Sequence, residues 1–229
     1  MSEQRWLFYM APLENAALIL HLGVYSYNRV NDSPELCGGH HSIADPFVNG
    51  RRHRLVINER SLHDYVPLYW ATHTPMQYVV TQKEKRLEQQ KLVFFLFDPS
   101  KIFAISGVLS TDGNAACEET LFYEGRGAEP YLDWKILETK DCYRPNYKRK
   151  KCAEVLVPDC IPPSLISKVA LRSKAAREVF RSHATRAAQT LHLQKTSRVP
   201  IEVCPDFYYP DPIDLSKFNL RWGKTETDQ

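Results

Sequence analysis

Residues 148–158 read Lys-Arg-Lys-Lys-Cys-Ala-Glu-Val-Leu-Val-Pro, so a basic cluster runs directly into an apolar segment that contains one carboxylate, Glu154. If this segment is a strand, Val155 and Val157 share one face, and Glu154 and Leu156 share the other. Residue types alone favour a solvated or salt-bridged Glu154 at the start of that strand. Burying the charge costs several kcal/mol unless it is paired or hydrogen-bonded. Catalytic sites tolerate such a cost most often, which makes Glu154 a candidate site residue.

The rest of the chain predicts an α+β domain, because short strands are mixed with few helices. Residues 13–22 have helical apolar spacing that stops at Gly23. A second helix is expected from Ser164, where basic and apolar positions alternate through residue 181. Pro67 confines its own strand to an edge, a bulge or a strand start. The expected strands are residues 6–9, 62–70, 92–97, 103–109, 154–157 and 199–203, with a short helix at about 45–54.

Size and composition set limits on the class of protein. The 229 residues, 43% of them hydrophobic, can bury one substantial core, so we expect a single domain over residues 1–229 with a flexible tail from about residue 215. The net charge of +3 is mild, and any nucleic-acid contact would need a local patch. No segment approaches the roughly 20 apolar residues of a membrane span. The six cysteines have no C-x-x-C pair, so we expect reduced thiols, no membrane contact and a cytoplasmic location.

Motif searches remove several enzyme classes. The chain has no Gly-x-Gly-x-x-Gly, no P-loop and no His-Glu-x-x-His. The pair His40-His41 has no third ligand at a suggestive spacing, so we expect a surface loop there and no metal site. Residues 144–151 hold five basic residues, with Tyr143 and Tyr147 interleaved. That mixture suits the phosphates and stacked bases of a single-stranded nucleic acid, with an ordinary solvated loop as the alternative.

Several blocks in one order resemble the DarT family of DNA ADP-ribosyltransferase toxins. They cover most of the chain and comprise residues 8–15, 41–44 with Arg51-Arg52, 63–70 with Thr74-Pro-Met76, 132–134, 150–157 and 205–209. The resemblance implies the ADP-ribosyltransferase fold, a split pair of small mixed or antiparallel sheets with flanking helices and with NAD held in a cleft.

The resemblance also implies roles for residues at matching positions. Glu154 matches the family's catalytic glutamate, which orients the NAD ribose and stabilises the positive charge that develops on it. Arg52 matches an active-site arginine, and Arg51 takes that place if the register shifts by one. Tyr69 is placed to stack on nicotinamide. The implied NAD-binding residues are Tyr9, Ala11, Asn15, Arg51 and Tyr69, and the implied DNA-binding residues are Tyr143, Arg144, Tyr147, Lys148, Arg149 and Lys150.

One position departs from the family pattern. Tyr9 stands where the family has a histidine on its first strand, and Pro12 where a second histidine follows. A phenol still donates a hydrogen bond, so an NAD pocket is compatible with this change.

The function implied is transfer of ADP-ribose from NAD, without a metal, to a nucleobase of single-stranded DNA. The protein would be the toxin of a toxin–antitoxin pair, its antitoxin removing the ADP-ribose or masking the toxin. The acceptor base, thymine or guanine, stays open. The same chemistry on RNA and a non-catalytic nucleic-acid-binding relative are the alternatives. We expect Glu154→Ala to abolish transfer with little effect on folding.

Overall fold

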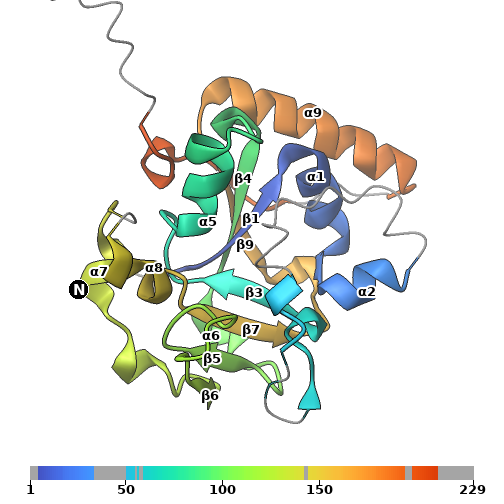
Figure 1. Cartoon of the computed structure of the whole chain (residues 1–229). Helices are drawn as coiled ribbons and strands as arrows, with labels where there is room; N and C mark the ends of the chain where they lie inside the picture. Colours follow the sequence, from blue (N-terminus) through green and yellow to red (C-terminus); the bar gives the residue numbers. More distant parts are fainter. Residues whose placement is uncertain are drawn as a thin grey trace, which may run out of the picture.

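The structure, a computed structural model, describes residues 5–33, 50–54, 56, 59–141, 144–193 and 198–210. Within these residues the main feature is an eight-stranded mixed sheet, with strand order β10-β9-β4-β1-β3-β7-β5-β6 (Figure 1). A two-stranded sheet pairs β2 with β8. The α+β class is confirmed. The strands are β1 (Leu7–Pro12), β2 (Val24–Tyr25), β3 (Tyr65–Tyr69), β4 (Leu92–Phe97), β5 (Leu109–Thr111), β6 (Phe122–Glu124), β7 (Glu154–Pro158), β8 (Cys160–Ile161), β9 (Ile166–Leu171) and β10 (Ile201–Val203).

The main sheet consists of two halves joined at one residue pair. In the described chain, β1 pairs with β3 only through Phe8 and Tyr69, whereas β1 pairs with β4 over its full length. Likewise β3 pairs with β7 over its full length. The expected split sheet therefore takes the form of two halves that share a short seam. Pro67 pairs with Leu156 and has no β1 partner on its other side, which is the edge-like environment that its missing N–H requires.

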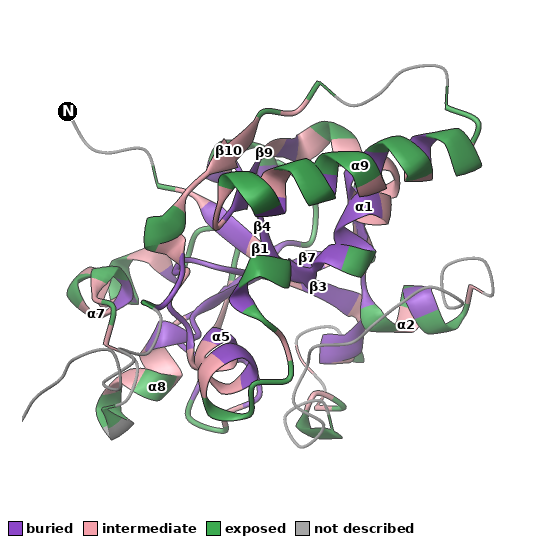
Figure 2. Cartoon of the chain, turned by 90° about the horizontal axis from the view of Figure 1, so that it is seen from above, coloured by how far each residue is buried: buried purple, intermediate pink, exposed green. Residues whose placement is uncertain are grey.

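Two helices cover one side of the sheet half formed by β10, β9, β4 and β1. Helix α1 (Leu13–Leu22) follows β1 directly and ends at Gly23, whose φ of 92° and whose approach to Ile161 O, 2.3 Å from an added Cβ, both exclude a side chain. Helix α9 (Lys174–Thr190) buries Ala176, Phe180, Ala184 and Ala188, spaced four residues apart, and lies over α1 with its exposed residues outward (Figure 2).

The remaining helical elements are short. None of the helices in the described ranges is both long and apolar enough to cross a membrane. The short helices are α2 (Tyr27–Asn31), α5 (Pro75–Tyr78), α6 (Pro99–Ile102), α7 (Trp134–Glu138) and α8 (Pro145–Lys151), with 3₁₀ turns at Leu62–Asp64, Gln89–Lys91, Glu129–Tyr131, Pro163–Leu165 and Pro205–Phe207 and a π turn at Val79–Lys83.

Two sequence-based assignments are wrong. The strand expected at residues 103–109 is a set of turns after α6, because Asp98 accepts from Ser100 N–H and caps a helix as soon as β4 ends. The helix expected from Ser164 is instead β9, which lies between β4 and β10, and the helix begins only after Ser173, whose hydroxyl accepts from Ala176 N–H. The basic segment from residue 144, for which a solvated loop was the alternative to a nucleic-acid contact, contains α8. Residues 45–49 of the helix expected at 45–54 lie outside the described residues.

The last described segment is held by side-chain hydrogen bonds to His73, to Gln77 of α5 and to β4. Gln77 donates to Phe207 O at 3.0 Å, and His73 Nε2 lies 3.2 Å from Tyr208 O. Because its partner is a carbonyl, that nitrogen carries the proton. Tyr208 in turn donates to Leu92 O at 2.9 Å. Burial lowers the pKa of His73 to about 4, so the imidazole is neutral in this contact.

This arrangement predicts a pH-dependent stability. A histidine whose pKa falls from 6.5 to about 4 on folding stabilises the folded state fully above pH 6.5, and the contribution is lost as the pH falls toward 4. We expect the free energy of unfolding to drop across that range by up to about 3 kcal/mol more than in His73→Gln, a neutral donor that does not titrate. Urea unfolding at several pH values measures the difference. Parallel curves for the two proteins would contradict the assignment.

Candidate active site

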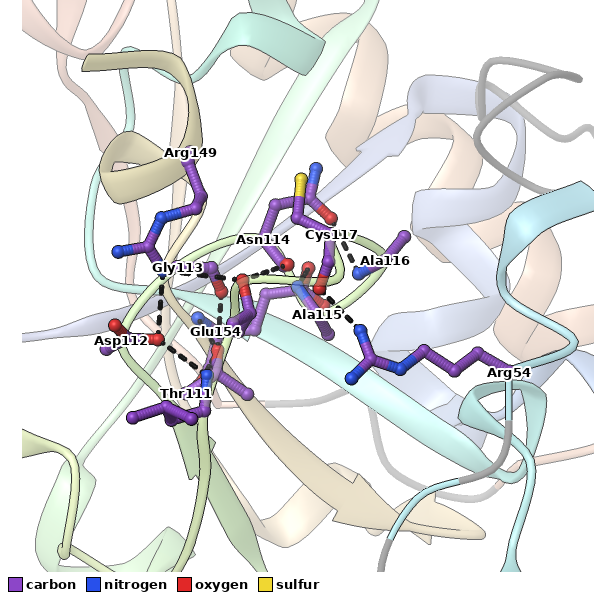
Figure 3. Close-up of polar contacts among 12 residues, drawn as sticks. Arg54, Thr111, Asp112, Gly113, Asn114, Ala115, Ala116, Cys117, Arg149 and Glu154 are labelled. Atoms are coloured by element: carbon purple, nitrogen blue, oxygen red, sulfur yellow. Dashed lines mark hydrogen bonds and ion pairs between the residues drawn. The ribbon is translucent and has the colours of Figure 1, made fainter. Parts of the chain in front are cut away.

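Glu154, the first residue of β7, is buried, with 1% of its side chain exposed. Its Oε2 accepts from Arg52 Nη1 at 3.0 Å. Its Oε1 accepts from the backbone N–H of Ala115 at 3.2 Å (Figure 3). A cation and an amide donor thus compensate the cost of burying the carboxylate. The salt-bridged alternative for Glu154 is therefore correct, and the solvated one is wrong.

Arg52 is nearly as enclosed as its partner, with 11% of its side chain exposed. Burial alone would lower the pKa of Arg52, but the charge and hydrogen bond of Glu154, together with Tyr69, outweigh it and raise the pKa. Its second terminal nitrogen, Nη2, is buried and has no acceptor in the described part of the chain. A guanidinium in this state has a donor available for an oxygen from outside the protein.

A row of side chains crosses the seam between the two sheet halves. Tyr69 pairs with Glu154 on β7 and with Phe8 on β1, so the three residues lie side by side on adjacent strands. Burial raises the pKa of Tyr69 well above its usual value, and the nearby Glu154 raises it further. Burial also raises the pKa of Tyr9 to about 12, so both phenols are neutral donors.

The other expected NAD-binding residues lie on the same stretch of chain. Ala11 is on β1 and Asn15 is in the first turn of α1, and both are buried. Arg51 is exposed. Burial raises the pKa of Cys117, and the charge of Arg51 opposes part of that rise. The structure thus brings Arg52 and Tyr69 to Glu154. Tyr9 interacts with Tyr69 but packs, like Ala11, with the core on the other face of the sheet.

The turn between β5 and β6 is part of the site and was missed in the sequence. Thr111 Oγ1 accepts from Glu154 N–H at 2.9 Å and donates to Gly113 O at 2.6 Å (Figure 3). The same turn supplies the Ala115 N–H. The turn contributes the backbone N–H of Ala115 to the carboxylate, and a backbone donor cannot be recognised from residue types. The run Thr-Asp-Gly-Asn at 111–114 is the one signal, since such residues form tight turns that present N–H groups.

The basic segment before Glu154 divides into exposed and enclosed cations. Lys148 is exposed, and Arg144 lies over the ring of Tyr147. Lys151, which was not assigned a role, is fully buried and donates to Leu137 O at 2.9 Å and to Thr139 O. Tyr143 and His40-His41 lie outside the described residues. Three cations form ion pairs, Arg144 with Asp141, Arg149 with Asp112 and Lys150 with Asp133.

In the ranges that the structure describes, no group of three or more His, Cys, Asp or Glu side chains could hold an ion.

Comparisons with known proteins assign the chain a family. Residues 8–209 match the family model described as ssDNA thymidine ADP-ribosyltransferase, DarT. The chain is 30% identical over 169 residues to a DNA ADP-ribosyl transferase–DNA ADP-ribosyl glycohydrolase fusion protein of Thermosipho africanus, covering 72% of this chain and 42% of that protein. It is 27% identical over 151 residues to a DNA ADP-ribosyl transferase of Thermus aquaticus, covering 65% of this chain and 64% of that protein. The matched part is thus less than two thirds of either relative.

Solved structures share the fold. Thermus sp. 2.9 DarT in complex with ADP-ribosylated ssDNA superposes with a TM-score of 0.76 at 21% identity, covering 90% of this chain and 97% of that one. The same Thermus protein in complex with NAD+ gives a TM-score of 0.72 at 20% identity, covering 90% and 98%. The expected ADP-ribosyltransferase fold is confirmed.

The contacts of Thr111 predict a local stability effect. Thr111→Val keeps the shape of the side chain but leaves the buried N–H of Glu154 without an acceptor, which costs about 1–3 kcal/mol. Thr111→Ser keeps the hydroxyl and should lie close to the wild type in urea unfolding. A loss in Thr111→Ser with little loss in Thr111→Val would show that packing of the methyl group matters, and not the hydrogen bond.

Proposed function

The chain belongs to the DarT family, and we propose that it transfers ADP-ribose from NAD to a thymidine of single-stranded DNA and releases nicotinamide. The observation that carries the proposal is the buried Glu154 carboxylate, which Arg52 and the Ala115 N–H hold beside Tyr69. The family description names the thymidine acceptor. The complexes of the Thermus protein with NAD+ and with ADP-ribosylated ssDNA support the two substrates.

Glu154 is proposed to act on the ribose. Breaking the bond between nicotinamide and ribose leaves positive charge on the anomeric carbon. A fixed carboxylate stabilises that charge most where water is excluded, as it is around Glu154. Each carboxylate oxygen has two lone pairs, and each accepts one hydrogen bond from the described residues. Capacity therefore remains for a ribose hydroxyl to donate to Glu154 and to be oriented by it.

Arg52 is proposed to bind the oxygen-rich parts of the substrates. Its Nη2, which has no acceptor among the described residues, fits a phosphate oxygen of NAD or a carbonyl of the acceptor base. Arg51 would add a second cation at the rim. Tyr69 is proposed to stack on nicotinamide, with Tyr9, Ala11 and Asn15 lining the same stretch. At position 9 a neutral phenol takes over the donor role of the family's histidine, since its pKa is about 12.

The DNA strand is proposed to run over the exposed part of α8 and the residues before it. Lys148 is exposed, and the Arg144 side chain is 68% exposed beside its carboxylate partner. Exposed ion pairs are weak, so a phosphate can replace the carboxylate at Arg144 or Lys150. Tyr147, and Tyr143 before it, would stack on bases.

The setting of the protein is also a proposal. A toxin with this activity requires an antitoxin, and the fusion of a transferase to a glycohydrolase in the Thermosipho relative supports one that removes ADP-ribose. Four cysteines in the described part of the chain are free thiols, which supports a reducing, cytoplasmic location. We propose that residues 1–229 act as one domain, because the family match spans both halves of the sheet.

The ion pair between Arg52 and Glu154 determines which substitution of Glu154 can test its role. Glu154→Ala, expected from the sequence to fold normally, would leave Arg52 buried and unpaired, at a cost of about 3–5 kcal/mol. Glu154→Gln keeps the shape and removes the charge. We expect Glu154→Gln to lower kcat for transfer by at least about 10²-fold while NAD still binds.

The measurement uses labelled NAD with single-stranded oligonucleotides that contain or lack thymidine, and with an RNA of the same sequence. Label is expected on thymidine-containing DNA alone. Label on protein alone, or on RNA in preference to DNA, would overturn the proposed acceptor. Full activity of Glu154→Gln would remove the assigned role of the carboxylate. Thermal unfolding of each variant separates lost chemistry from lost structure.

A further inference from the structure

Arg149 contacts the β5–β6 turn with both its side chain and its backbone. The guanidinium Nη1 donates to Asp112 Oδ1 at 3.0 Å and lies 3.4 Å from Thr120 Oγ1. The carbonyl oxygen of Arg149 accepts from Asn114 N–H at 2.9 Å. Figure 3 shows Arg149 reaching from α8 to the start of this turn. Arg149 thus contacts the turn at three residues, Asp112, Asn114 and Thr120.

The turn held by Arg149 also contacts Glu154, through the Ala115 N–H. Asp112 Oδ1 also accepts from Leu121 N–H at 2.9 Å, so one carboxylate ties both ends of the turn to Arg149. Asn114, held by the Arg149 carbonyl, is followed directly by Ala115, whose N–H donates to Glu154 Oε1. A displacement of the turn would therefore shift the amide that sets the orientation of the carboxylate.

Gly113 shows how closely the side chain is packed. A Cβ on Gly113 would lie 2.5 Å from Arg149 Nη1 and 2.8 Å from its Cγ. The arginine stem occupies the space that any side chain at position 113 would need. The far side of the turn is held as well, because Arg54 donates to Cys117 O.

Exposure separates Arg149 from the other paired cations of its segment. The Arg149 side chain is 29% exposed and that of Asp112 is 15% exposed, against 68% for Arg144. Exchanging Asp112 for a DNA phosphate would also leave the turn without its anchor. A planar guanidinium suits this place because it bonds two acceptors at once, which an ammonium does with less directional control.

We infer that Arg149 is a positioning residue, which through Asp112 and Asn114 holds the Ala115 N–H against Glu154. The inference rests on the proposed function for the role of Glu154. It replaces, for this one residue, the phosphate contact that the basic composition of the segment predicts.

The test compares Arg149→Met, Arg149→Lys and Asp112→Asn with wild type in three assays. These are transfer to thymidine-containing single-stranded DNA, slow hydrolysis of NAD without DNA, and affinity for the oligonucleotide at several salt concentrations. Both Arg149→Met and Asp112→Asn are expected to lower kcat of transfer and of NAD hydrolysis by about 10- to 10²-fold. DNA affinity and its salt dependence should stay unchanged, and Arg149→Lys should recover only part of kcat.

Two further variants sharpen the result. The double variant Asp112→Arg with Arg149→Asp reverses the pair and should be more active than Asp112→Arg or Arg149→Asp alone. It should stay below wild type, because an arginine at position 112 cannot accept from Leu121 N–H. Arg181→Met removes an exposed partner of Glu178 on α9 and should behave as wild type. Loss of DNA affinity with a shallower salt dependence and intact NAD hydrolysis would instead make Arg149 a phosphate contact and overturn the inference.

A readout that needs no activity keeps the inference separate from the proposed function. Amide hydrogen exchange at Ala115 is expected to be faster in Arg149→Met than in wild type and in Arg181→Met. An inactive wild type would refute the proposed function and leave this comparison valid. Unchanged exchange at Ala115 in a folded Arg149→Met protein would overturn the positioning role, whatever the enzyme does.

Discussion

The need to compensate one buried negative charge explains how the polar part of this structure is arranged. The carboxylate of Glu154 is 1% exposed, and its two donors come from residues 102 and 39 positions earlier in the chain. Neither donor is local to β7. The fold must therefore bring the segment of Arg52 and the β5–β6 turn against the first residue of one strand. A loss of either donor would leave a charge in a place where water cannot solvate it.

The apolar framework makes that placement possible. Strand β4 is buried along its whole length, and Val155 and Val157 of β7 pack into the largest core cluster. These residues fix the strands, so the side chain of Glu154 has no freedom to turn toward solvent. The site lies at the seam, where Tyr69 joins the two halves of the sheet. Within the main sheet, ladder pairing is least extensive there, since β1 and β3 pair through Phe8 and Tyr69 alone in the described residues.

The spacing of apolar residues predicted those helices and strands that are determined by their own local sequence. Helix α1, strand β4 and strand β7 were predicted close to their observed bounds, and Glu154 stood out because a charge interrupted an apolar run. A single helix was wrongly predicted across residues 166–181, because the alternation of basic and apolar residues there also suits a strand followed by a helix. The Ala115 N–H could not be found, because a backbone donor leaves no trace in composition. Nor could composition separate Arg149 from Lys148, since Asp112 is 37 positions away from Arg149.

Helix α8 links the proposed DNA surface to the carboxylate. Its seven residues expose Lys148, hold the turn through Arg149, and pair Lys150 with Asp133, the residue that caps α7. Its last residue, Lys151, donates to carbonyls at the end of α7 and precedes Glu154 by three positions. The cations of α8 therefore contact α7 at both of its ends, through Asp133 and through the carbonyls of Leu137 and Thr139. Figure 1 shows α7 and α8 side by side, with β7 following α8. A DNA strand bound at Lys148 would contact the same helix, α8, whose Arg149 holds the turn that orients Glu154. The proposed DNA contact and the orientation of the carboxylate therefore depend on one helix.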